Sequence, residues 1–260
     1  MNTSLRRARA SALGRPARLT AAAAAFAALA GCDASDYDQS RVEGELGRGD
    51  FNYECISPAD VACEYRCTLF TCQASATNER ASVFPSRVAV GGLFALTYVH
   101  EGADASSRYR VVPASPSWVD TPAGANPSVA SAAETFVAKR AGQLAFLARN
   151  QAGQVADLLH VEFVPLDHLE VNDFGAVTAA VKLSPGESIN LQAYPQGVDG
   201  RSLGGALSYA WSSSDEAVAA VAVGSASDRV KIEAKAEGTA TVRVAVGEVT
   251  REVSIEVGAP

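Results

Sequence analysis

Histidine is scarce in this sequence, and the residue patterns of common enzyme chemistries are missing. The chain has three histidines in 260 residues, His100, His160 and His168, and no Gly-x-Ser-x-Gly, phosphate-binding loop or glycine-rich dinucleotide fingerprint. Because catalysis needs converging titratable or nucleophilic side chains, we predict no catalytic residues and no bound metal. His160, Glu162, Asp167 and His168 could form a weak metal site near residue 165, but solvated polar side chains are the simpler interpretation.

The sequence also lacks an apolar run long enough to cross a membrane. Crossing takes roughly 20 apolar residues, whereas the run within residues 19–31 is shorter and ends at Cys32. Five arginines and no acidic residue precede it within residues 1–18. A basic start, a short apolar run and small residues at its end are typical of a secretory signal peptide. We therefore predict that residues 1–31 are removed on export.

The end of this signal, Leu29-Ala30-Gly31-Cys32, resembles the lipobox of bacterial lipoproteins. The resemblance implies that Cys32 receives a diacylglycerol, that the chain is cut before it, and that the new N-terminus is acylated, with palmitate as a typical chain. Two or three acyl chains hold a protein stably on a membrane. We therefore expect an exported protein anchored by lipid to the bacterial cell envelope, in the inner or the outer membrane, with no cofactor besides these chains.

Basic residues are few after Cys32. Removing the five arginines of the signal leaves 17 basic residues against 29 acidic ones, a net charge of −12. Nucleic acid attracts proteins with a basic patch, so it is not an expected partner. Residues 32–50 are polar and acidic without periodicity, which predicts a disordered tether between the lipid and the folded part.

The next segment, residues 51–82, is rich in cysteine. It contains Cys55, Cys63, Cys67 and Cys72. An even number in an exported chain predicts two disulfides. Zinc is the alternative, but the paired short spacings of zinc sites are missing.

A short helix is expected over about residues 58–67, because Ser57-Pro58-Ala59-Asp60 has the pattern of a helix start. Cys63 and Cys67 would then share one helix face. We predict that they do not bond to each other but to Cys55 and Cys72, one each.

From residue 83 onward, apolar and polar residues alternate in short stretches such as "RVAVGGLFALTYV" and "RVKIEAKAEGTATVRVAV". This period of two, broken by glycine and proline, predicts strands with one buried face. Two anchors show a repeat: Phe94 and Leu96 match Ile189 and Leu191, and "AGQLAFLA" matches "EGTATVRV", at offsets of 95 and 96. We predict an all-β protein with two tandem immunoglobulin-like β-sandwiches, over residues 83–165 and 166–258.

The second half carries "YAWSSSDEAVAAV" followed by "AKAEGTATVRV". These motifs resemble the group 2 bacterial Ig-like domain family over about residues 166–258, which implies an Ig-like sandwich there. The first half has Pro116-Ser117-Trp118-Val119 in the corresponding region and is predicted to be Ig-like from the repeat alone. Trp211, which shares its strand parity with Tyr209, is expected in the core.

These features predict a lipid-anchored cell-envelope protein that acts as a non-catalytic adhesion, spacer or protein-interaction module. Its partner would be a protein or cell-wall component that the sequence does not identify. The alternative is a carbohydrate- or cell-wall-binding surface module, with Trp118 and Trp211 as binding platforms. Aromatic residues make up 7% of the chain, which speaks against a row of exposed rings. A hydrolase is a third hypothesis and would need a converging His/Asp/Glu pocket.

Overall fold

The computed structural model describes residues 41–67, 72–75, 84–85, 87–102, 108–122, 133–173, 176–223 and 228–258. Residues 38–260 form one compact unit. The described part is built from β-strands and one short 3-10 helix, η1 (Pro116–Trp118). It contains no helix that is long and apolar enough to span a membrane. Cys32 and the tether up to residue 40 lie outside the described residues.

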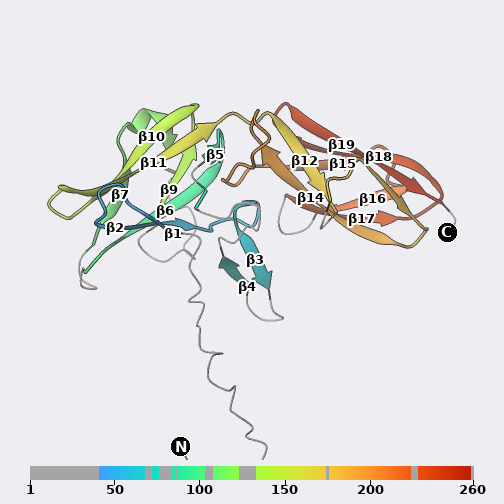
Figure 1. Cartoon of the computed structure of the whole chain (residues 1–260). Helices are drawn as coiled ribbons and strands as arrows, with labels where there is room; N and C mark the ends of the chain where they lie inside the picture. Colours follow the sequence, from blue (N-terminus) through green and yellow to red (C-terminus); the bar gives the residue numbers. More distant parts are fainter. Residues whose placement is uncertain are drawn as a thin grey trace, which may run out of the picture. The chain divides into compact units, whose positions relative to one another are not determined.

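The first sandwich has two sheets (Figure 1). They pack around one apolar core. The first sheet has the order β1 (Arg41–Glu43), β2 (Gly49–Glu54), β6 (Leu93–His100), β9 (Glu134–Ala138), β8 (Val119–Asp120). The second sheet has the order β5 (Arg87–Ala89), β11 (Val155–Val164), β10 (Gly142–Arg149), β7 (Arg110–Pro113).

The second sandwich repeats this arrangement. Its first sheet has the order β12 (His168–Asn172), β14 (Ser188–Gln196), β17 (Arg229–Ala234), β16 (Ala219–Val223). Its second sheet has the order β13 (Ala180–Leu183), β19 (Val249–Val257), β18 (Gly238–Val246), β15 (Ala210–Ser213).

The strand order confirms the predicted all-β fold with two Ig-like sandwiches. Each sandwich has one parallel strand pair, β5 with β11 and β13 with β19, and its other strand pairs are antiparallel. The sequence offset of 95 aligns Phe94 and Leu96 on β6 with Ile189 and Leu191 on β14, and these two strands hold the same place in their sheets. The offset of 96 likewise aligns β10 with β18. The first half is therefore Ig-like by topology as well as by repeat.

The first sandwich begins earlier in the chain than predicted. β1 lies inside residues 32–50, where we predicted a disordered tether, and Asp50 of β2 forms an ion pair of 2.7 Å with Arg41 of β1. β2 then pairs with β6 in the middle of the sheet. By topology β2 corresponds to β12, so the cysteine-rich segment is an insertion between β2 and β5 of the first sandwich. In the second sandwich, residues 173–179 make the same connection.

The short helix predicted over residues 58–67 is absent from the structure. Residues 58–62 form turns, and Glu64–Cys67 is strand β3, which pairs with β4 (Cys72–Ser75). Asp60 does not complete a capping box, because its carboxylate accepts hydrogen bonds from Tyr53 and the amide of Ala62. A disulfide between Cys55 and Cys63 also closes this segment into a loop, with Cα atoms 5.7 Å apart.

Candidate functional site

The most distinctive polar site lies where one loop of the second sandwich meets the first. This loop, residues 197–209, connects β14 to β15, and we call it the docking loop. Its Gly204 pairs with Val88 of β5 in a parallel bridge, and its Ala206 pairs with Leu93 of β6 in an antiparallel bridge. Because β5 is an edge strand, the loop continues the sheet of the first sandwich, as an added peptide strand would.

Four backbone hydrogen bonds hold this pairing. The amide of Gly204 donates to Arg87 O at 3.0 Å, and the amide of Ala89 donates to Gly204 O at 2.9 Å. The amides of Leu93 and Ala206 donate to each other's carbonyl oxygens at 2.9 and 2.7 Å. We call these paired segments, with Asp60 beside them, the junction.

Glycine is required at the junction because the docking loop packs closely against the first sandwich. A Cβ atom on Gly205 would lie 2.9 Å from Val88 Cγ1, and Gly205 has a φ of 93°, a conformation that other residues rarely adopt. A Cβ atom on Gly204 would lie 2.8 Å from Pro85 Cβ. The sequence Gly204-Gly205 thus permits a contact that any side chain would separate.

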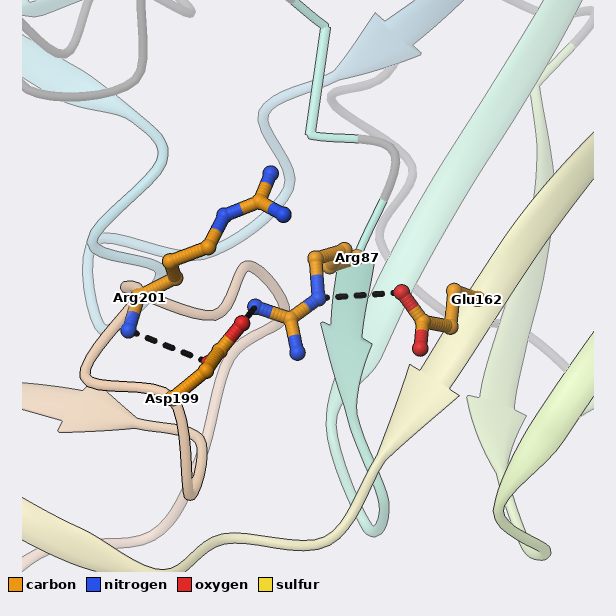
Figure 2. Close-up of polar contacts among 4 residues, drawn as sticks. All are labelled: Arg87, Glu162, Asp199 and Arg201. Atoms are coloured by element: carbon orange, nitrogen blue, oxygen red, sulfur yellow. Dashed lines mark hydrogen bonds and ion pairs between the residues drawn. The ribbon is translucent and has the colours of Figure 1, made fainter.

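Arg87 joins the two sandwiches with its side chain (Figure 2). Its Nε donates to Glu162 of β11 at 3.0 Å, and its Nη1 lies 3.1 Å from the Asp199 carboxylate in the docking loop. The Arg87 side chain is 10% exposed, whereas Glu162 and Asp199 are 52% and 41% exposed. Asp199 also accepts the amide of Arg201, which holds its carboxylate toward Arg87. Burial by itself would raise the pKa of Asp199. The hydrogen bonds from Arg87 and Arg201 outweigh this effect and leave the pKa below its usual value.

Asp60 lies at the junction with no exposed surface. Its Oδ1 accepts the amides of Ala62 and Gly205, both at 3.0 Å, and its Oδ2 accepts the hydroxyl of Tyr53 at 2.6 Å. The bond to Gly205 crosses from the first half of the chain to the second. Burial raises the pKa of Asp60 to about 6, although the three hydrogen bonds favour the charged form.

A second buried carboxyl, Asp228, interacts electrostatically with Asp60. Its Oδ2 accepts Gln192 Nε2 at 2.8 Å and lies 3.8 Å from Arg229 Nε. Among the described residues, neither Asp228 Oδ1 nor the buried hydroxyl of Tyr209 has a hydrogen-bond partner. Burial raises the pKa of Asp228 to about 6, and burial with both carboxyls raises the pKa of Tyr209 well above its usual value.

Apolar contacts continue across the junction. Ala59, Ala89 and Val164 come from the first half, yet they belong to the apolar core of the second sandwich, together with Leu203 of the docking loop. Their chain neighbours Val88 and Phe163 belong to the core of the first sandwich. Side chains alternate between the two faces of a strand, so β5 and β11 each contribute to both cores.

A shallow groove of about 430 Å³ runs along the junction. It is lined mainly by small and apolar residues, including Ala59, Leu93, Val137 and Leu207. No charged side chain lines it. Its polar side chains are the hydroxyls of Ser57 and Ser208.

The predicted cysteine sites are resolved in part. Cys55 bonds to Cys63, so Cys63 is not bonded to Cys67, as predicted. Cys67 and Cys72 lie directly opposite each other in the β3–β4 ladder, and their bridge stays a prediction.

The structure brings Asp167 and His168 together but does not assemble the four residues of the weak metal cluster. Glu162 binds Arg87, His160 lies 2.7 Å from Glu45, and His168 lies 2.8 Å from Asp167. Within the described residues, no three His, Cys, Asp or Glu side chains are placed to hold a metal ion.

Both tryptophans are half-buried and pack against apolar cores, Trp118 against the first and Trp211 against the second. We predicted a core position for Trp211. It is less buried than a central core residue because β15 is an edge strand.

Sequence reasoning named Asp60 only as part of a helix start and assigned no role to Arg87, Asp199 or Asp228. Their roles depend on partners far away in the chain, such as Gly205 for Asp60. The pair Gly204-Gly205 is the one local signal, since adjacent glycines mark a special backbone conformation or a close approach.

No family model matches this chain, and no curated protein matches it. The matching solved structures include domains 4 and 5 of the S-layer protein SbsC, at 14% identity over 63% of this chain and 83% of that chain, with a TM-score of 0.33. They also include the Escherichia coli adhesin FdeC, at 16% identity over 66% and 61%, with a TM-score of 0.29. A third is the bacterial integrin-binding protein invasin, at 12% identity over 67% and 38%, with a TM-score of 0.28. The fold assignment rests on the sheets described above and not on these similarities.

Proposed function

We propose that this protein is an exported, lipid-anchored envelope protein whose two Ig-like sandwiches act as one coupled, non-catalytic adhesion or spacer module. The junction carries this proposal. Paired backbones, the Arg87 contacts and a shared apolar core connect the two sandwiches. A partner bound to one sandwich is therefore held in a defined orientation to the other, as a spacer or adhesin requires.

Export is supported by two observations of different kinds. Leu29-Ala30-Gly31-Cys32 has the lipobox pattern, and the disulfide between Cys55 and Cys63 fits an oxidising compartment. Group 2 bacterial Ig-like character for residues 166–258 remains part of the proposal. It rests on the motifs around Trp211 and on the Ig-like strand order.

Cell fractionation tests the anchor. The wild-type protein should incorporate labelled fatty acid and sediment with membranes. Cys32→Ser should lose the label, whereas the control Cys67→Ser should keep it. Equal labelling of Cys32→Ser and the wild type contradicts lipid anchoring at this residue.

Photocrosslinking in living cells tests the module. A crosslinker at Val198, which is 83% exposed at the tip of the docking loop, should capture a specific protein or cell-wall fragment. The same crosslinker at Lys182, on an exposed edge strand of the second sandwich, is the control for random collisions. Identical products from both positions contradict a specific partner near the junction.

The carbohydrate-binding alternative receives less support. Carbohydrate platforms present open aromatic faces, whereas Trp118 and Trp211 both pack against apolar cores. Trp118 also lies close to Gly142, where a Cβ atom would meet its ring at 2.9 Å. The indoles therefore have a packing role in each sandwich.

A further inference from the structure

Asp60 at the junction interacts electrostatically with a second buried carboxyl group, Asp228, and little positive charge compensates the two. Asp60 is fully buried and Asp228 is 1% exposed. Tyr53 and Asp228 act on Asp60, and Arg229 acts on Asp228. The Tyr209 hydroxyl interacts electrostatically with both carboxyls. Arg229 reaches Asp228 at 3.8 Å, longer than a hydrogen bond. Two negative charges in such a site repel each other and lose hydration.

The hydrogen bonds of the two carboxyls differ, and this decides where a proton can bind. Both oxygens of Asp60 accept hydrogen bonds, three in total. Asp228 has one hydrogen-bonded oxygen, Oδ2, while Oδ1 has no partner in the described structure, nor has the Tyr209 hydroxyl. A protonated Asp228 would lose no hydrogen bond that it now accepts at Oδ2. The cluster therefore has a free buried oxygen at which a proton is accommodated.

We propose that the junction is a proton-sensitive latch, in which the Asp60–Asp228 pair binds a proton on mild acidification and thereby tightens the docking of the second sandwich on the first. Asp60 is the mechanical link, since it holds the Gly205 amide of the docking loop. Asp228 and Tyr209 connect the same cluster to the second sandwich. Proton uptake removes the repulsion between the carboxyls while the hydrogen bond to Gly205 is retained.

The direction of the pH dependence follows from the two carboxyls. Burial raises the pKa of both from 3.8 to about 6. A raised pKa in the folded state gives stability that is fully present below pH 3.8 and is lost as the pH rises through about 6. The junction should therefore be tighter at pH 5 than at pH 7.5. The lowered pKa values of Asp199 and Glu233 act in the opposite direction, but only at lower pH, as these carboxylates become protonated.

Hydrogen–deuterium exchange on the mature chain, residues 32–260 with Cys32→Ser, tests the latch. The reporters are the amides of Gly204, Gly205, Ala206 and Leu93, which bond across the junction. Their protection factors should rise on the order of tenfold to a hundredfold from pH 7.5 to pH 5. Amides of the β18–β19 ladder are the internal control and should change less. Equal changes in both sets overturn the proposal.

Asp228→Asn sharpens the test because it removes the charge and keeps the shape. It should raise junction protection at pH 7.5 toward the wild-type value at pH 5, and it should reduce the pH dependence. Asp199→Asn is the matched control, a docking-loop carboxyl that is partly exposed, and it should leave the pH dependence unchanged between pH 5 and 7.5. An unchanged pH dependence in Asp228→Asn overturns the proposal.

Carboxyl-carbon NMR of the unmutated residues keeps the test independent of how the variant folds. It should give titration midpoints well above 4 for the pair, and midpoints near 4 for both would overturn the latch. The latch extends the proposed function and relies on the same junction. If the junction amides are protected equally at both pH values, the latch is contradicted and the coupled module is not. If these amides are unprotected at every pH, the coupled module itself is contradicted.

Discussion

The two sandwiches share a strand order but fill it with different side chains. The first core is aromatic: Phe94 lies within 5.6–5.8 Å of Phe136, Phe146 and Phe163, measured between ring centroids. The second core is aliphatic, with Leu191, Ile232, Val242 and Ile255 fully buried. The same topology can therefore be filled by an aromatic or an aliphatic core. The strand pleat sets which positions face inward, and any apolar side chains that fill the space there can form the core.

The connections between strands differ more than the strands do. Residues 55–86 separate β2 from β5, whereas residues 173–179 separate β12 from β13. The long insertion supplies the disulfide and Asp60, and the second sandwich supplies the docking loop. The junction therefore forms from the features in which the two repeats differ. Each sandwich contains one of the two tryptophans, so single-tryptophan variants can report on each sandwich separately.

The largest effect is expected from truncating the aromatic core. Phe94→Ala should lower the free energy of unfolding by about 3–5 kcal/mol, because it removes a fully buried ring and leaves a cavity. Ile189→Ala, at the matching position of the second sandwich, should cost less because Ile189 is half-buried. Urea denaturation followed by Trp118 or Trp211 fluorescence measures both. Equal losses would show that the two cores do not differ in energy at this position.

The insertion should stabilise the first sandwich through its disulfide. The double variant Cys55→Ala and Cys63→Ala should lose about 2–3 kcal/mol in the chain-entropy model of a short loop. The unfolding midpoint that Trp118 reports should fall to a lower denaturant concentration than the midpoint that Trp211 reports.

In the same variant, mass spectrometry without reduction should still find Cys67 bonded to Cys72. A variant with free thiols at these two positions would contradict the second bridge.

A methyl group in the docking loop should weaken the coupling of the two sandwiches. Gly205→Ala should cost about 1–3 kcal/mol, since its Cβ would meet Val88 at 2.9 Å in a strained backbone. Gly200→Ala is the matched control: its φ is also positive, at 69°, but its Cβ would meet nothing within 4 Å. The melting temperature should therefore fall more for Gly205→Ala than for Gly200→Ala, and the transitions reported by the two tryptophans should lie further apart. If both variants lose the same stability, the loss comes from backbone strain and not from the contact with Val88.

The smallest effect is expected at Arg87. Arg87→Met should weaken the coupling by about 1 kcal/mol or less, because its partners are about half exposed and solvent screens such pairs. Added salt should lower the coupling energy of the wild type toward that of the variant, and it should change the coupling energy of the variant little. Lys139→Met removes a pair with Asp120 inside one sandwich and is the control. A loss at Arg87 far above that at Lys139 and insensitive to salt would indicate that packing, not charge, makes this contact.

Much of the fold could be predicted from sequence, and the errors have identifiable causes. Alternation on β6, β10, β14 and β18 is local, so it predicted these strands and their repeat. The predicted helix failed because Ser57-Pro58-Ala59-Asp60 is a local pattern, whereas the Asp60 carboxylate binds Tyr53, Ala62 and Gly205. The tether was predicted to extend to residue 50 because a charged, non-periodic stretch gives no local sign of strand pairing. Arg41 and Asp50 are polar, yet they form an ion pair between the two strands of an edge hairpin.

The sequence by itself determined the all-β class, the two repeats and the expectation of a lipid anchor at Cys32, because each depends on periodicity or on a short contiguous motif. The tertiary structure decided where the first sandwich begins and how the two sandwiches are joined. Arg87 is 112 positions from Asp199, and Asp60 is 145 positions from Gly205. Burial and hydrogen bonding between such distant residues arise only after both sandwiches have formed, and the raised pKa values of Asp60 and Asp228 come from that burial.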